Sequence, residues 1–323
     1  MINYIFLTII VVFFAMNMGA SGVAPSFAAS YGARLISRKN SILLFGAFVI
    51  LGAVISGRSV SITLGKGLIP QELISFKAVS IILLAATMSL FLANILKVPQ
   101  STSQVTVGAV VGVGLYLKHL STKMLFVKIL PMWLALPLAS YILTYFLYRM
   151  VYPPERDNLH IYQAFFANQR KLKISSLAAS CYVAFAIGSN NVANAVGPLF
   201  GAGIIGIGPG LLAISPLFCI GAWLLGKGPT ESAAREIIPL GMASSTLVSF
   251  VTATLLLIAS VLGIPQSLVQ LNLTSIFAVS CVKDGHRHTM DKHLTRKTFI
   301  IWAITPIISI VIAFLLSTIF LKV

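Results

Sequence analysis

Two segments of the chain carry the same pattern, Pro-Gln-Ser-Thr-Ser-Gln at residues 99–104 and Pro-Gln-Ser-Leu-Val-Gln at residues 265–270. One lies in each half of a chain of 323 residues. Repetition at so long a spacing indicates a duplicated fold, so it decides the architecture before any single element is assigned.

The sequence around these segments also repeats, at one constant offset that pairs Ala15 with Ala184 and Trp133 with Trp302. The matched residues of the first half are Ala15, Gly19, Val23, Ala24, Gly32, Ala33, Gly52, Ala53, Gly57, Pro70, Lys128, Trp133 and Pro137. The Trp and Pro matches carry the most weight, because Gly and Ala coincide often in apolar sequence. The repeat predicts two homologous halves, residues 1–150 and 172–323, joined by a cytoplasmic connector at 151–171.

The composition is that of a membrane protein, with 58% hydrophobic and 9% charged residues. A soluble domain has roughly 25% charged residues. We therefore expect an all-α polytopic membrane protein in a lipid bilayer. The 23 Lys and Arg residues outnumber the 7 Asp and Glu residues. They lie in short spacers between apolar blocks, which indicates topology signals and no nucleic-acid partner.

Each half divides into five apolar blocks. The blocks span residues 2–33, 41–57, 74–96, 100–117 and 124–150, then 172–205, 210–226, 236–262, 266–282 and 298–321. Because five is odd, the second half enters the membrane from the opposite side. This gives an inverted repeat of about 5+5 transmembrane segments, as in many secondary transporters.

The positive-inside rule tests this orientation independently. With the N-terminus outside, 16 of the 23 Lys and Arg residues fall on the inward side. The sequence therefore predicts a multi-pass protein of the cell's inner (plasma) membrane with both termini outside.

The first block of each half is too long for one simple crossing. About 32 residues at 1.5 Å each reach roughly 48 Å, whereas the hydrocarbon core is about 30 Å thick. We expect broken or re-entrant helices, with breaks at residues 17–25 and 186–194, where Gly, Ser, Asn and Pro gather. Such breaks must line a polar cavity or be buried in protein.

The repeated segments 99–104 and 265–270 are expected to open two further half-helices. Free backbone N–H groups at a helix start, joined by hydroxyl and amide donors, form a site for an oxyanion. Four such starts facing one another would make a neutral, electropositive cage. Gly108 and Gly112 are instead assigned to close helix packing.

These motifs resemble those of the inorganic phosphate transporter (PiT) family over essentially the whole chain. The family carries Gly-Ala-Asn-Asp-Val-Ala-Asn-Ala once per half. Residues 188–195 are a near match and residues 19–26 a degraded one. The family's second signature, Pro-Val-Ser-Thr-Thr-His, resembles residues 99–104 well and residues 265–270 partly. The resemblance implies a transporter, an oxyanion site formed by these segments, and a possible homodimer.

The substrate-binding residues expected from the motifs and from the resemblance come from both halves of the chain. They are Ser21, Gly22, Val23, Ser101, Thr102, Ser103, Gln104, Asn190, Asn191, Val192, Ser267 and Gln270.

The departures from the family pattern bear on the substrate. Gly22 and Asn191 replace the family's two aspartates, and Gln104 and Gln270 replace its two signature histidines. Phosphate near neutral pH still carries a proton and benefits from a carboxylate acceptor, whereas sulfate requires only donors. The substitutions favour sulfate, and residues 14–22 resemble the bacterial sulfate-permease branch of the family. A phosphate transporter without a carboxylate Na⁺ site remains the alternative.

Loss of the aspartates also removes the hard-oxygen ligands that Na⁺ would use. Proton symport is then the expected coupling, as the resemblance also implies. Glu231, Glu236 and Glu72 are candidate proton carriers, and ordinary interfacial charge is the alternative role for all three. A passive anion channel has the same composition and would ignore an imposed pH gradient.

Arg58 and Lys227 follow the equivalent glycines Gly57 and Gly226. In one interpretation these two cations attract or gate the anion from opposite sides. In the other they snorkel to the membrane interface.

The inventory of side chains argues against an enzyme. The apolar blocks contain no His-Glu-x-x-His motif, no paired Asp residues and no Ser-His arrangement. Residues 284–293 gather Asp and His, but Arg287 and Lys292 interrupt them, so we expect a solvated loop more than a metal or pH-sensing site. We predict no metal and no cofactor, and free packing roles for Cys181, Cys219 and Cys281.

Overall fold

The computed structural model describes residues 2–95, 100–160, 163, 168–228, 230, 241–291 and 293–321. At residues 93–95, 288, 290, 291, 293–299 and 301 the structure describes the backbone alone.

Helices account for nearly all of the described chain, and no strand occurs in it. The first half contains α1 (Ile2–Gly32), α2 (Arg38–Ser56), α3 (Arg58–Ile62), α4 (Phe76–Ile95), α5 (Thr102–Leu117) and α6 (Leu130–Arg149), with short turns of other helix types at Thr63–Gly67, Gln71–Leu73 and Met124–Ile129. The second half contains α8 (Gln169–Asn191), α9 (Ala193–Gly201), α10 (Ile207–Leu225), α12 (Met242–Val261), α13 (Leu268–Asp284), α14 (His286–Asp291) and α15 (His293–Phe320). Each predicted apolar block corresponds to a long helix, or to α8 and α9 together in the sixth block.

Seven of the described helices are long and apolar enough to cross a membrane, judged by length and composition. Their outer faces expose large apolar side chains, such as Leu134 at 77% and Ile307 at 55%. A soluble protein does not tolerate such a surface, whereas lipid does. The prediction of an all-helical, multi-pass membrane protein is confirmed.

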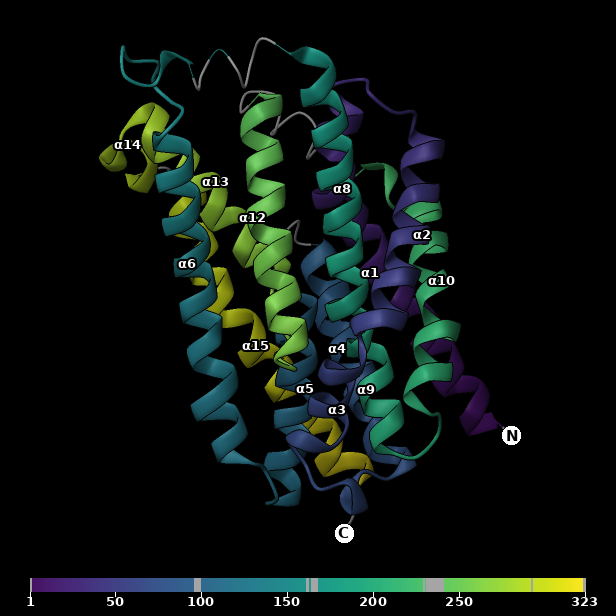
Figure 1. Ribbon diagram of the computed structural model, residues 1–323. Helices are drawn as coiled ribbons and strands as arrows, with labels where there is room; N and C mark the ends of the chain where they lie inside the picture. The colour runs from purple at the N-terminus through teal and green to yellow at the C-terminus, as the bar shows by residue number, and fades with distance from the viewer. Residues whose placement is uncertain are drawn as a thin grey trace.

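Two helices from opposite halves, α1 and α10, cross in very close contact (Figure 1). A Cβ atom on Gly19 of α1 would overlap the backbone of Phe218 in α10, and one on Gly221 of α10 would overlap the backbone of Met16 in α1. The two helices therefore touch backbone to backbone, which only glycine permits.

The same crossing occurs between α2 and α8. Here a Cβ on Gly52 would overlap the backbone of Phe185, and one on Gly188 would overlap the backbone of Val49. All four residues correspond, at the offset of the sequence repeat, to those of the α1–α10 crossing. The first helix of each half thus packs on the second helix of the other half.

The predicted break in the first block is wrong. α1 runs without interruption through residues 17–25, with Pro25 inside it. The hydroxyls of Ser21 and Ser26 donate to the helix's own carbonyls at Met18 and Gly22, at 3.0 and 2.9 Å. These two hydroxyls therefore bond within α1, and the helix is not broken at either residue. At 31 residues, or about 46 Å, α1 exceeds the membrane core and must tilt or extend beyond it.

The second predicted break is reduced to a single residue. Val192 separates α8 from α9, yet its φ of −61° and ψ of −33° remain helical. The backbone N–H groups of Ala195 and Val196 both reach the Val192 carbonyl, at 3.2 Å. The helix is therefore interrupted at Val192, but the backbone keeps helical angles through the interruption.

α5 and α13 are short, with 16 and 17 residues. α5 packs closely against α15, where Cβ atoms on Gly108 and Gly112 would crowd the carbonyl oxygens of Pro306 and Ile310. The packing role predicted for these two glycines is confirmed.

A Gly52→Ala substitution tests the backbone crossing. The new methyl has no space beside Phe185, so we expect the free energy of unfolding to fall by about 1–3 kcal/mol, typical of overpacking. Gly208→Ala is the matched control, because Gly208 also lies in a helix but has nothing within 4 Å of its Cβ position. Thermal unfolding of the purified protein in detergent measures both, and equal Tm values would contradict the crossing.

Candidate functional site

The two repeated motifs begin α5 and α13 with the same N-cap. Ser101 Oγ accepts a hydrogen bond from the Gln104 N–H at 3.2 Å, and Ser267 Oγ accepts one from the Gln270 N–H at 3.1 Å. Both serines have extended backbone angles, as N-cap residues do. The helix starts expected from the sequence are confirmed as local structure.

Both helix starts are buried. Ser101 is 2% exposed and Ser267 is fully buried, and Thr102, Ser103 and Gln104 are at most 7% exposed. The first N–H groups of a helix have no carbonyl partner within it and lie at the positive end of its dipole. Two such positive ends therefore lie inside the protein, away from water.

Asn190, near the end of α8, links the two starts through one side chain. Its Nδ2 donates to Ile264 O and to Ser260 Oγ, both at 3.0 Å. Its Oδ1 accepts from the Gln266 N–H at 3.0 Å and from Ser103 Oγ at 3.4 Å. The two backbone partners fix which end of the amide is oxygen. Because all four bonding positions are used, we assign Asn190 to positioning the site and not to contacting a substrate.

Asn194, one turn further on, holds the start of α5. Its Nδ2 donates to Thr102 Oγ1 at 3.4 Å and to Ser103 Oγ at 3.2 Å. Asn194 was not among the predicted site residues. The signal was present, because Asn194 is the third Asn of the near-match motif at residues 188–195.

Unsatisfied polar atoms gather on these segments. Among the described residues, seven buried side-chain atoms of the motifs have no hydrogen-bond partner. They are Gln100 Oε1, Gln104 Oε1, Asn191 Oδ1, Asn194 Oδ1, Gln266 Oε1, Gln266 Nε2 and Gln270 Oε1. Leaving one such atom unpaired costs about 1–3 kcal/mol, and native proteins contain few of them. Six of the seven are acceptor oxygens and one, Gln266 Nε2, is a donor, so the atoms as placed suit water or another group that brings protons.

The site is neutral in its own residues. Segments 99–104, 186–195 and 265–270 contain no Asp, Glu, Lys or Arg. These three segments therefore offer a bound charge amides, hydroxyls and the ends of helix dipoles.

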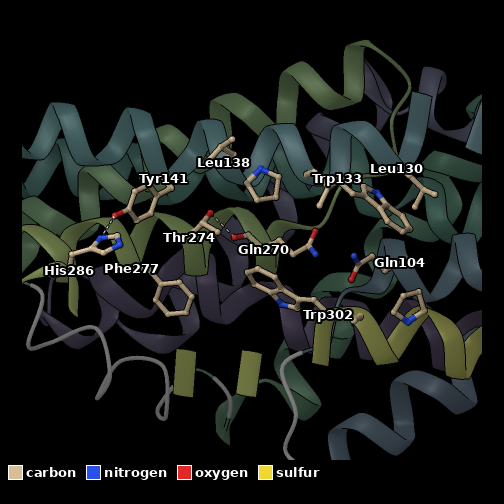
Figure 2. A pocket seen from close by; sticks show the side chains of 14 residues that line it. Gln104, Leu130, Trp133, Leu138, Tyr141, Gln270, Thr274, Phe277, His286 and Trp302 are labelled. Carbon is tan, nitrogen blue, oxygen red and sulfur yellow. Dashed lines mark hydrogen bonds between the residues drawn. The ribbon is translucent and has the colours of Figure 1, made fainter. Parts of the chain in front are cut away.

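Gln104 and Gln270 also border a cavity of about 710 Å³. Figure 2 shows their amides pointing toward one another across it, with Trp133 and Trp302 beside them. Trp133 Nε1 donates to Pro265 O at 2.8 Å, so the wall of this cavity also holds the segment that leads into α13.

The first-half residues Ser21, Gly22 and Val23 lie within α1. The Ser21 hydroxyl bonds inside its own helix, Gly22 faces Phe45 and Ile187, and Val23 is 2% exposed. Their predicted substrate role stays a prediction, as does that of Val192, which is fully buried where α8 meets α9.

Of the predicted gating and coupling residues, those that the structure describes are exposed, whereas the polar cluster is buried. Arg58 and Lys227 are exposed, each directly after a glycine that caps a helix. Glu72 is exposed in the short turn Gln71–Leu73. Glu231 and Glu236 lie outside the described residues. Within the part of the chain that the structure describes, no three His, Cys, Asp or Glu side chains come close enough to hold a metal ion.

The protein is helical and multi-pass, and two of its short helices begin at a buried polar site. This arrangement is typical of membrane transporters. The family of the protein follows from sequence comparison. The chain belongs to the phosphate transporter family, whose model matches residues 18–313. The resemblance seen in the motifs is confirmed, and the protein is a transporter and not an enzyme.

Individual relatives agree with this assignment. The chain is 38% identical over 311 residues to the sulfate permease CysP of Bacillus subtilis, covering 96% of this chain and 86% of that protein. It is 28% identical over 137 residues to sodium-dependent phosphate transporter 2 of Cricetulus griseus, covering 39% of this chain and 21% of that protein. A solved structure of the sodium-dependent phosphate transporter has the same fold, with a TM-score of 0.81, 22% identity, and coverage of 99% of this chain and 100% of that one.

Asn190→Ala tests the positioning role. It would leave Gln266 N and Ile264 O unpaired in a buried place, so we expect a loss of stability of about 2 kcal/mol or more together with loss of transport. Asn194→Ala should lose transport with a smaller loss of stability, because it removes two long hydrogen bonds to hydroxyl oxygens and leaves no backbone group unpaired. Thermal unfolding and uptake assays separate the two roles, with exposed Asn40→Ala as the control. An Asn190→Ala protein of unchanged Tm would show that Asn190 does not position the site.

Proposed function

We propose that this protein imports sulfate across the cytoplasmic membrane as a secondary active transporter. The observation that carries the proposal is the neutral, buried meeting of two helix starts without a carboxylate. In the proposed cycle, sulfate binds at the starts of α5 and α13 and passes to the cytoplasm by alternating access.

The chemistry of the site separates sulfate from phosphate. Sulfate is fully ionised at neutral pH and needs only hydrogen-bond donors. The N–H groups at the helix starts and the serine hydroxyls would supply these donors, and the amides of Gln104, Gln270 and Asn191 would do so with their NH₂ groups turned toward the anion. A carboxylate would repel the dianion strongly in a medium of low dielectric. The residue at the position of the second family aspartate is Asn191, whose amide can donate.

The similarity to the Bacillus subtilis sulfate permease supports this substrate. Other relatives carry names of phosphate transporters, so a phosphate transporter without a carboxylate Na⁺ site is the competing function. Thiosulfate, molybdate and chromate share the charge and tetrahedral shape of sulfate and fall within the same proposal.

The proposed topology is an inverted repeat of residues 1–150 and 172–323 around the connector 151–171, with both termini outside. Two features support it. In Figure 1, α1 and α8 run in opposite directions, and both termini lie toward the lower end. The equivalent crossings of α1 with α10 and of α2 with α8 also relate the two halves.

The proposed coupling is proton symport, and the proposed assembly is a homodimer in the bilayer. The neutral site offers no carboxylate for Na⁺, which supports protons as the driving ion. Glu231 and Glu72 remain candidate carriers, and Arg58 and Lys227 remain candidate gating residues.

Uptake by proteoliposomes tests the substrate and the coupling together. We expect uptake of labelled sulfate to be driven by an inward proton gradient and reduced by excess thiosulfate or selenate, but not by phosphate. Inhibition by phosphate alone would favour the competing function. Sulfate flux that ignores the gradient would identify a passive channel, and empty liposomes provide the background.

Asn191→Asp tests the role of the missing carboxylate. A negative charge at this buried position should weaken sulfate binding more than tenfold, which corresponds to at least about 1.4 kcal/mol. The matched control is Asn40→Asp, the same change at an exposed position in the first turn of α2. Sulfate affinity equal to wild type in Asn191→Asp would remove the electrostatic basis of the proposal.

A further inference from the structure

The cavity beside Gln104 and Gln270 is an elongated groove. Its lining on α6 runs from Leu130 to Tyr141, a rise of about 16 Å along the helix. Figure 2 shows Tyr141 and His286 at one end, and Trp133, Gln104 and Trp302 at the other. The groove therefore extends from the level of the buried site toward the junction of α13 and α14.

The walls of the groove are almost entirely apolar. Besides the two glutamines, its lining includes Trp133, Trp302, Phe277, Pro137 and Pro306. Leu134 and Leu138 also line it, and they are 77% and 58% exposed on the outer face of α6. The groove is thus accessible from the face of the protein that contacts lipid.

A basic residue, Arg287, lies next to one end of the groove. His286 lines the groove and shares a hydrogen bond with Tyr141 OH at 3.2 Å, and Arg287 beside it is exposed. Asp284, two residues before His286, accepts a hydrogen bond from Ser280 Oγ at 3.1 Å.

The groove is long and apolar. Its volume is about 710 Å³, and it follows α6 for about 16 Å. Because it opens on the face that contacts lipid, a hydrocarbon chain from the bilayer suits its shape and its lining.

We propose that this groove binds one acyl chain of an anionic phospholipid, with the headgroup beside His286 and Arg287. Basic pockets between membrane helices recognise such headgroups by charge. The far end of the chain lies against Trp133, whose indole holds Pro265 at the entry to α13. Bound lipid therefore braces the segment that forms the transport site. This inference depends on the groove and not on which anion is carried.

Tryptophan fluorescence provides the test, because two of the three tryptophans line the groove. Trp223, exposed on α10, is first removed by Trp223→Phe. The protein is reconstituted in phosphatidylcholine with a small fraction of lipid brominated on the acyl chain. We expect brominated phosphatidylglycerol to quench at least threefold more than brominated phosphatidylcholine at the same fraction.

Filling the groove should abolish this preference. Ala303→Phe places a ring in the groove, and Ala303→Leu is a smaller filler if the first variant does not fold. Ile304→Phe is the matched control, because Ile304 is the next residue of α15, is 47% exposed and does not line the groove. Quenching that persists unchanged in both filled variants would overturn the groove as the binding place.

The headgroup is tested by the double change His286→Gln and Arg287→Gln. We expect quenching by phosphatidylglycerol to fall to the level of phosphatidylcholine. Equal quenching by the two lipids in the parent protein, or a preference that survives the double change, would overturn the proposed anionic lipid.

Discussion

Four glycines that bring helix backbones into contact hold the structure together. In a membrane, apolar side chains gain little by associating, since lipid solvates them equally well, so helices associate through close packing. Gly19 and Gly221 provide this contact between α1 and α10, and Gly52 and Gly188 provide it between α2 and α8. Each contact joins a helix of one half to a helix of the other. The two halves therefore form one body, and the short helices α5 and α13 are positioned within it.

The site built on this body is unequal in its two halves. The second half supplies Asn190 and Asn194, which hold the start of α5 and the segment before α13. The equivalent positions of the first half are Ser21 and Pro25, and the Ser21 hydroxyl bonds within α1. One half thus provides most of the polar framework for both helix starts. Of the two matching segments, the one in α8 and α9 carries the amides.

The sequence predicted the features that depend on local pattern. The apolar blocks, the serine caps of α5 and α13 and the packing role of Gly108 all follow from periodicity or spacing, and the structure contains them. The break expected in α1 does not exist, because its hydroxyls bond to the helix's own carbonyls. The role of Asn190 could not be predicted, since its partners Ile264 and Gln266 lie far from it along the chain. Long-range hydrogen bonds of this kind leave no local signal.

The saturation of Asn190 has a consequence for movement. An amide with four bonds to three segments cannot follow one segment without releasing the others. Any cycle that keeps these bonds must carry the end of α8, the start of α5, the end of α12 and the approach to α13 together as one block. In such a cycle the two helix starts cannot move relative to each other. A bound anion and the groups that donate to it would then move together, as one unit, relative to the other helices.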